Sequence, residues 1–253
     1  MKFANGFRRM LVFVVAMSLA SFAGSRADKK YKEKPGAPQT VDSGSFGVFI
    51  KGQRVATETF SVQQQSSGNV IKSQVKEASG ASSASQKSDL EITSAGELLR
   101  YEWSQSSGGS LTVTPNNDFL LERISVSASS KPAEKPFLMP STSAILDNNF
   151  FVHREVLVWR YLAAACKPEG GNWKCAQSPT PFGVLVPQDQ TSMSVRMELV
   201  GKEKVTIRGT ERELLRLNLN GENFAWAMWV DEKDQFKLMR VAIPADNTEV
   251  VRD

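Results

Sequence analysis

Histidine and cysteine are scarce in this sequence, and their scarcity excludes several kinds of functional site. The chain has one histidine, His153, and two cysteines, Cys166 and Cys175, among 253 residues. Structural zinc sites take four ligands from Cys and His, so these three residues cannot complete one. A catalytic triad would depend on His153 alone. The sequence therefore predicts no metal site, no cofactor and no catalytic residue. The remaining enzymatic hypothesis is a hydrolase that pairs His153 with a distant Ser or Asp.

A surplus of charge is also missing once the first 27 residues are set apart. The whole chain has a formal charge of +4, and residues 1–27 hold four basic residues and no acidic one. Residues 28–253 therefore carry 27 basic and 27 acidic side chains. Binding to nucleic acid needs a basic face, which a chain without a basic surplus does not predict. Nucleic acid is therefore not an expected partner.

Long apolar runs are absent except for one, Met10–Ala20, which follows a positively charged start. Small residues after this run fit the small-x-small cleavage pattern at Ala23 and at Ala27. The run is too short for a membrane span, which needs about 20 apolar residues. The sequence predicts a signal peptide over residues 1–27, cleaved near Ala23 or Ala27. The mature chain is then periplasmic or secreted and has no transmembrane segment.

The two cysteines close the short segment CKPEGGNWKC. Export brings the chain into an oxidising compartment, where disulfides form and persist. Pro168, Gly170 and Gly171 favour a turn, so the ends of the segment can meet. A CxxC redox motif is absent. We predict a Cys166–Cys175 disulfide, with free thiols or pairing between chains as the alternatives.

Short alternating segments separated by turn signals dominate the rest of the sequence. Residues 28–43 are polar and predict a flexible leader. From Phe46 onward, apolar and polar residues alternate, with turn signals such as Lys51-Gly52 and Asn220-Gly221. We expect residues 44–253 to form a single β-rich α+β domain. Its fold would be a curved antiparallel sheet or an incomplete barrel of about eleven or twelve strands.

One segment departs from this alternation. Between Ile145 and Cys166 the apolar residues recur at helical spacing, which predicts one main helix near residues 147–165. Asp147 is the expected N-cap of this helix. The apolar face is wide, so we expect the helix to be well buried.

The hairpin around Asn220-Gly221 carries the candidate binding residues. On its second strand Phe224, Trp226 and Met228 share one face, opposite a face of leucines. Such a face can fill a core, or it can line the apolar interior of a half-open barrel. The candidate ligand lining is Phe224, Trp226 and Met228, with Trp103 and Phe236 as possible neighbours.

Two segments carry a resemblance to known proteins. Phe46–Phe60 (FGVFIKGQRVATETF) resembles the opening hairpin of certain uncharacterised bacterial envelope proteins, and Trp226–Pro244 (WAMWVDEKDQFKLMRVAIP) resembles their closing hairpins. That group is similar in outline to the carriers that move lipoproteins between bacterial membranes. The resemblance implies a curved antiparallel sheet, an incomplete barrel closed by a helix. The Cys166–Cys175 loop and the Pro/Ser-rich segment 127–143 are not part of this pattern.

Two functional hypotheses follow. The first is an exported soluble protein that binds an apolar ligand or lipid-like group in a half-barrel, which predicts a continuous cavity. The alternative is a structural or interaction protein of the envelope, partnered by another envelope protein. It predicts a filled core without a ligand, and function on an exposed edge or apolar patch.

Overall fold

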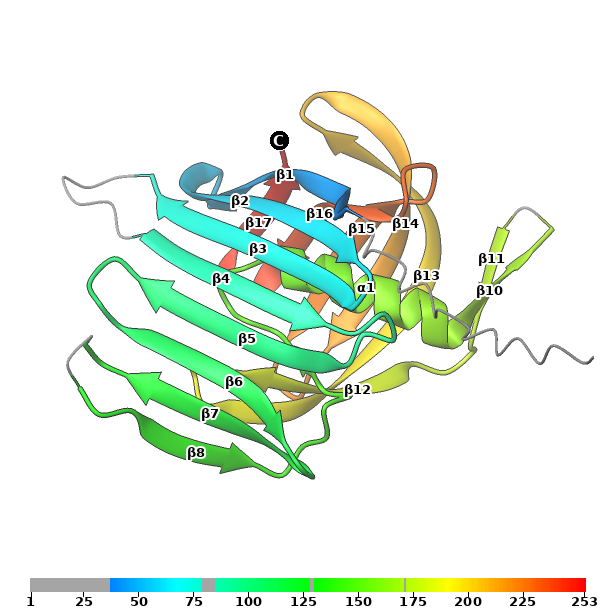
Figure 1. Ribbon diagram of the computed structural model, residues 1–253. Coiled ribbons are helices and arrows are strands. Elements are labelled where there is room, and N and C mark those ends of the chain that lie inside the picture. Colours follow the sequence, from blue (N-terminus) through cyan, green and yellow to red (C-terminus); the bar gives the residue numbers. More distant parts are fainter. Residues whose placement is uncertain (1–36, 79–84, 128–129, 171) are drawn as a thin grey trace, which may run out of the picture. The chain divides into compact units, whose positions relative to one another are not determined.

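The computed structural model of the chain describes residues 37–78, 85–127, 130–170 and 172–253 (Figure 1). The predicted signal peptide, residues 1–27, lies outside the described residues. The first strands are β1 (Gln39–Ile50), β2 (Gln53–Gln65), β3 (Gly68–Glu77), β4 (Ser85–Ile92), β5 (Leu98–Gln105), β6 (Ser110–Asn116), β7 (Phe119–Ser125) and β8 (Ala133–Phe137).

The second half of the chain contains the main helix and the remaining strands. After β9 (Ala144–Ile145) come α1 (Val152–Ala165), β10 (Cys166–Glu169) and β11 (Asn172–Cys175). The others are β12 (Thr180–Val186), β13 (Thr191–Ile207), β14 (Thr210–Asn220), β15 (Ala225–Asp231), β16 (Lys237–Ile243), the 3-10 helix η1 (Pro244–Asp246) and β17 (Thr248–Arg252).

Fifteen of these strands form one sheet, in the order β8-β7-β6-β5-β4-β3-β2-β1-β17-β16-β15-β14-β13-β12-β9. All neighbours pair antiparallel except β9 and β12, which are parallel. The first and last strands lie side by side, with Phe46 opposite Arg252. The two sheet edges, β8 and β9, are separated in sequence by residues 138–143 and are not paired, so the sheet is not closed.

The fold class is confirmed in outline, but the predicted strand number of eleven or twelve is wrong. The described residues form seventeen strands. Several of the extra strands are short and lie where the sequence shows no alternation: β8 in the Pro/Ser-rich connection, and β10 and β11 in the cysteine loop. These segments form strands because they pair with a neighbouring strand: β8 pairs with β7, and β10 pairs with β11. An amphipathic pattern is not needed for such pairing.

The predicted leader, residues 28–43, is also too long at its C-terminal end. β1 begins at Gln39, and the side chain of Asp42 is buried. Arg252 on the neighbouring β17 donates two hydrogen bonds to the Asp42 carboxylate, at 2.6 and 2.7 Å. This ion pair between residues far apart in the sequence stabilises the polar start of β1 in the sheet.

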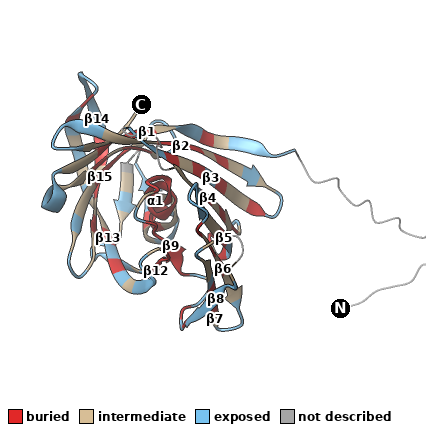
Figure 2. Cartoon of the chain, turned by 90° about the vertical axis from the view of Figure 1, so that its left-hand side faces the viewer, coloured by how far each residue is buried: buried red, intermediate tan, exposed pale blue. Residues whose placement is uncertain are grey.

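Helix α1 lies in the concavity of the curved sheet (Figure 2). In that view β3–β6 lie on one side of the helix and β13–β15 on the other. Its buried apolar residues, Val152, Val156, Leu157, Val158, Tyr161 and Leu162, belong to the same core cluster as the inward side chains of the strands. Within the described residues, no helix has the length and hydropathy needed to cross a bilayer.

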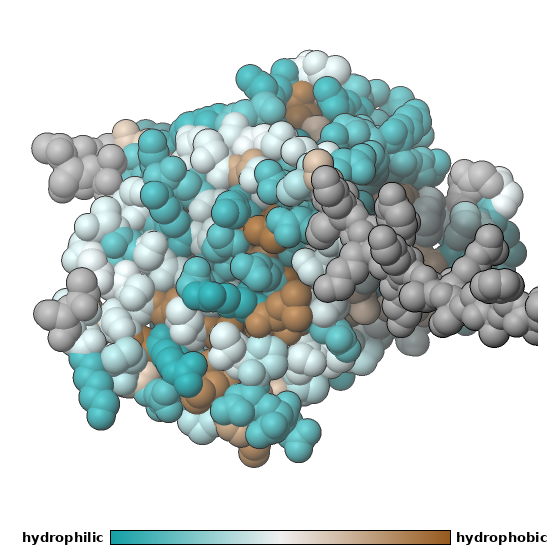
Figure 3. All heavy atoms as spheres, in the orientation of Figure 1, coloured by the Kyte–Doolittle hydropathy of each residue, from teal (hydrophilic) through white to brown (hydrophobic). Residues whose placement is uncertain are grey.

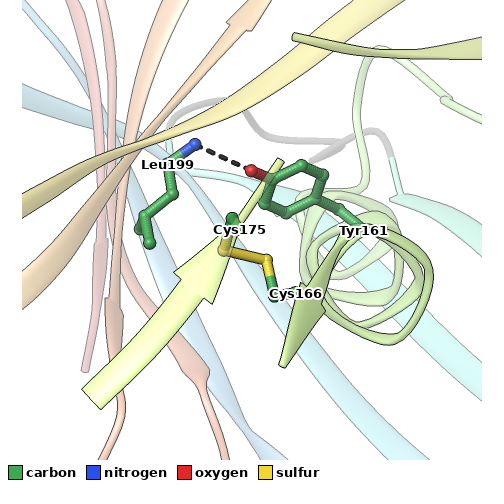
Figure 4. Close-up of a disulfide and its surroundings, with 4 residues drawn as sticks. All are labelled: Tyr161, Cys166, Cys175 and Leu199. Atoms are coloured by element: carbon green, nitrogen blue, oxygen red, sulfur yellow. Dashed lines mark hydrogen bonds between the residues drawn. A yellow bond between two sulfur atoms is a disulfide. The ribbon is translucent and has the colours of Figure 1, made fainter. Parts of the chain in front are cut away.

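The predicted disulfide is confirmed at the end of α1 (Figure 4). The sulfur atoms of Cys166 and Cys175 are 2.02 Å apart, at the base of the β10–β11 hairpin. One turn earlier, the hydroxyl of Tyr161 accepts a hydrogen bond of 2.9 Å from the backbone N–H of Leu199 on β13. The end of the helix is therefore fixed both to the hairpin and to the sheet.

We expect the double variant Cys166→Ser, Cys175→Ser to lose about 2.5 kcal/mol of unfolding free energy, because the crosslink restricts the unfolded chain. Urea denaturation measures this loss, and reduction of the wild type should reproduce it. An unfolding midpoint that does not respond to reduction would contradict the structural role of the disulfide.

Candidate ligand-binding cavity

A cavity of about 730 Å³ lies at the end of the sheet where the β1–β2 and β14–β15 turns are found. The N-terminus of α1 contributes Phe151 and Arg154 to its lining, and the C-terminal residues of β16 and the start of β17 close another side. The apolar part of the lining includes Val48, Ile50, Val75, Phe151, Phe224 and Trp226. The polar part holds one cationic side chain, Arg154, and two acidic ones, Glu77 and Asp246, so the cavity combines aromatic and aliphatic walls with charges of both signs.

The structure brings two of the predicted lining residues together in this cavity. Phe224 and Trp226 both line it, and their ring centroids are 4.7 Å apart. The register of the hairpin places Leu219 opposite Trp226, as the sequence pattern predicts. The hairpin itself is looser than Asn220-Gly221 predicts, because residues 221–224 form the connection between β14 and β15.

Met228, Trp103 and Phe236 do not line the cavity. Met228 is fully buried in the core, because β15 runs from the cavity into the packed interior. The indole N–H of Trp103 donates a 3.0 Å hydrogen bond to the Gln86 side chain, and it is Gln86 that lines the cavity. Phe236 packs edge-on against Trp173 of the disulfide hairpin, with ring centroids 4.8 Å apart.

Arg154 is the cavity residue that sequence reasoning missed. Its side chain has no exposed surface, and its guanidinium lies 4.8 Å from the ring centroids of both Phe151 and Trp226. Nη1 donates hydrogen bonds to the backbone carbonyls of Asp147 and Phe150. Burial lowers the pKa of Arg154 to about 10, so the group is still a cation at neutral pH. The signal in the sequence was a charged residue inside the apolar run FFVHREVLV.

Glu58 on β2 caps the N-terminus of α1, and Asp147 does not, contrary to the prediction. The helix begins at Val152, and its N-cap residue Phe151 has no capping side chain of its own. The Glu58 carboxylate accepts hydrogen bonds from the backbone N–H groups of Phe151, at 2.6 Å, and Val152, at 3.3 Å. The Ser73 hydroxyl donates a third, of 2.7 Å. Burial raises the pKa of Glu58 to about 7, against the opposite effect of these hydrogen bonds.

Asp147 instead organises the loop before the helix. Its carboxylate accepts hydrogen bonds from the Tyr101 hydroxyl, the Gln188 amide and, at 2.8 Å, the backbone N–H of Asn149. Burial raises the pKa of Asp147 despite these hydrogen bonds. The carboxylate thus joins strand β5, the β12–β13 turn and the loop that leads into α1.

Glu155 anchors the opposite side of the helix. Its carboxylate accepts hydrogen bonds from the Leu238 backbone N–H, at 2.7 Å, and from Arg252, at 3.2 Å. The same arginine binds Asp42, so one cluster of charges joins α1 to β1, β16 and β17. Burial raises the pKa of Glu155 well above its usual value. The helix is therefore held to the sheet by polar contacts on both sides.

His153 lies away from any catalytic arrangement within the part of the chain that is described. Both of its ring nitrogens are buried without a hydrogen-bond partner, and its ring is 5.7 Å from those of Tyr101 and Phe150. Burial lowers the pKa of His153 to about 3, so the imidazole is neutral. Residues 37–78, 85–127, 130–170 and 172–253 also hold no cluster of three or more His, Cys, Asp or Glu side chains able to bind a metal.

Two other hollows lie elsewhere on the described residues. One of about 640 Å³ runs over β2–β6; polar residues such as Lys72, Gln74, Lys87 and Thr112 line it together with Phe60, Leu111 and the predicted Trp103. Figure 3 shows hydrophilic and neutral residues over most of this face of the sheet. The other, of about 490 Å³, lies beside Trp159, Arg160 and Phe182 in the second half of the helix. Neither contains a fully buried charge like that of Arg154.

Comparisons of the chain with protein-family models, curated proteins and solved structures return no match. The geometry of the cavity is therefore the ground for the functional proposal.

The raised pKa of Glu58 predicts a pH-dependent contribution to stability. An unfolded glutamate has a pKa near 4.5, so the folded state binds the proton more tightly. The resulting stabilisation is complete below about pH 4.5 and is lost as the pH rises through about 7. Relative to Glu58→Gln, the wild type should lose about 3 kcal/mol of unfolding free energy between pH 4 and pH 8.

Urea denaturation of both proteins at the two pH values measures this difference. The other buried carboxyl groups are shared by both proteins, so their titration cancels. The assigned proton affinity would be contradicted if the unfolding free energy of the wild type, relative to that of Glu58→Gln, stayed constant or rose between pH 4 and pH 8.

Proposed function

We propose that this chain is an exported protein that holds an apolar or lipid-like ligand in the cavity at the N-terminus of α1. The observation that carries the proposal is the cavity of about 730 Å³ with its aromatic and aliphatic walls. Small-molecule sites commonly have volumes of roughly 300–1,000 Å³ and are lined mostly by apolar side chains with a few polar groups. The cavity has such a volume, and its lining contains apolar side chains as well as polar and charged ones.

Burial of apolar surface would drive binding. Each Å² of apolar surface that a ligand removes from water contributes about 25 cal/mol, before the free-energy cost of association. Phe224 and Trp226 offer rings on one wall, and Val48 and Ile50 offer aliphatic contacts from β1. The helix supports this region because Glu58, Asp147 and Glu155 fix it to the sheet.

Two observations support export as part of the proposal. The first 27 residues have the composition of a signal peptide. The Cys166–Cys175 disulfide fits an oxidising compartment. An apolar or lipid-like molecule is the kind of ligand that we propose for the periplasmic or secreted protein.

Replacement of Trp226 by Ala tests the role of the cavity. The change removes a wall of the site, and we expect about tenfold weaker binding of the neutral apolar probe N-phenyl-1-naphthylamine. Fluorescence titration measures the affinity, and circular dichroism checks that the variant is folded. Trp173→Ala is the matched control, because Trp173 packs against Phe236 and does not line the cavity.

If the Trp226→Ala and Trp173→Ala proteins bound the probe with equal affinity, the probe would bind outside this cavity. A wild type that does not bind the probe at all would favour the envelope interaction protein with a filled core.

Expression of the full chain in a bacterial host tests export. We expect the protein in the periplasmic or secreted fraction, with an intact mass that corresponds to cleavage after a residue near Ala23 or Ala27. Recovery of the uncleaved chain in the cytoplasmic fraction would contradict this part of the proposal.

A further inference from the structure

We propose that the cavity selects amphiphiles with an anionic head group, a carboxylate or a phosphate, and that the free edge of the Arg154 guanidinium binds this group. The inference rests on the proposed function and names the class of ligand. It requires that Arg154 is held in place, that part of its hydrogen-bonding capacity is unused, and that no side chain already neutralises it by direct contact.

The guanidinium is held rigidly by two sets of contacts. Both hydrogen-bond acceptors of Nη1 are backbone carbonyls, those of Asp147 and Phe150, which lie just before the helix. The rings of Phe151 and Trp226 lie at 4.8 Å and provide cation–π contacts. One end of the guanidinium is thus bound to the backbone, and two aromatic rings restrict its motion.

The edge of the Arg154 guanidinium formed by Nε and Nη2 is the one that we propose for the oxyanion. Nε and Nη2 are buried, and neither has a hydrogen-bond partner among the described residues. Because Nη1 lies on the Cδ side, the Nε–H and one Nη2–H point in the same direction on the opposite edge. Two such parallel donors match the two oxygens of a carboxylate or phosphate in a bidentate contact.

No carboxylate forms an ion pair with Arg154 in the described part of the chain, although two lie near enough to raise its pKa. Asp147 accepts hydrogen bonds from Tyr101, Gln188 and Asn149 instead. Glu58 accepts its hydrogen bonds from Ser73 and the start of the helix. A buried charge is normally paired directly, so Nε and Nη2 of Arg154 are unused donors for an external counter-ion.

Trp226 is the partly exposed ring beside this edge. Arg154 has no exposed surface, whereas Trp226 is partly exposed and contacts both the guanidinium and Phe224. Binding of a head group at Nε and Nη2 requires the indole ring to move, while the two backbone carbonyls at Nη1 keep the guanidinium in place. The apolar tail then occupies the space between Phe224 and the strand β1 residues. Phosphate without a tail would gain nothing from the apolar walls.

Ligands that have the same chain length and differ in their head group test the proposal on the wild-type protein. Dodecanoic acid, dodecyl phosphate and dodecanol are compared by displacement of N-phenyl-1-naphthylamine at pH 8, with inorganic phosphate as the tail-free probe. We expect the two anionic amphiphiles to bind about 10- to 100-fold more tightly than the alcohol, because a charged hydrogen-bonded head group replaces a neutral one. Inorganic phosphate should not displace the dye.

The outcomes separate this inference from the proposed function. Equal affinities for acid and alcohol would overturn the head-group assignment and leave the apolar cavity intact as a site. If inorganic phosphate displaced the dye as strongly as dodecyl phosphate does, the site would be a simple anion site. That result would overturn the claim that the cavity selects amphiphiles. Failure of all the amphiphiles and the dye to bind would overturn both proposals.

Replacement of Arg154 by Gln adds a test of the residue. The preference for dodecanoic acid over dodecanol should fall to about onefold, because the bidentate charged contact is lost. Arg160→Gln is the matched control: Arg160 follows on the same helix, donates a 2.6 Å hydrogen bond to the Thr142 carbonyl and lines a different hollow. A preserved preference in folded Arg154→Gln would overturn the assignment. If that variant does not fold, the wild-type series decides.

Discussion

The fold depends on the burial of three consecutive polar residues, His153, Arg154 and Glu155, at the start of a helix in the sheet's concavity. A polar or charged group inside an apolar interior needs hydrogen-bond partners, because an unsatisfied buried polar group is destabilising. Carbonyls before the helix bind Arg154, and Arg252 with the backbone of β16 binds Glu155. Glu58 supplies the missing cap. These contacts set the position of α1 against the strands.

The cavity follows from that position. The helix starts at Val152, and the turns of β1–β2 and β14–β15 extend around its N-terminus. The space between them is lined by the last inward side chains of the strands and by Phe151 and Arg154 from the helix. The cavity places apolar walls beside one buried cation, Arg154, and the acidic Glu77 and Asp246. In the proposal, the walls would favour a tail and the guanidinium would orient a head group.

Local patterns were sufficient to predict part of this structure, and long-range contacts account for the rest. The alternation in Phe224, Trp226 and Met228 gave the correct face of β15, and the short loop between Cys166 and Cys175 gave the disulfide. Glu58 could not be recognised as the cap of α1, because 93 residues separate it from Phe151. Strand β8 lacks alternation and forms on the edge that β7 provides. Met228 is fully buried and does not line the cavity. Alternation along a strand predicts which face a side chain is on, but it does not predict how far the cavity extends along that face.

Native mass spectrometry of the protein, expressed as the full chain and purified gently from the cell fraction that contains it, tests the central claim most directly. A ligand-binding cavity predicts a stoichiometric adduct that dissociates as a molecule with an apolar chain. A mass equal to that of the protein alone, unchanged after incubation with envelope lipids, would contradict the claim that this cavity is a binding site.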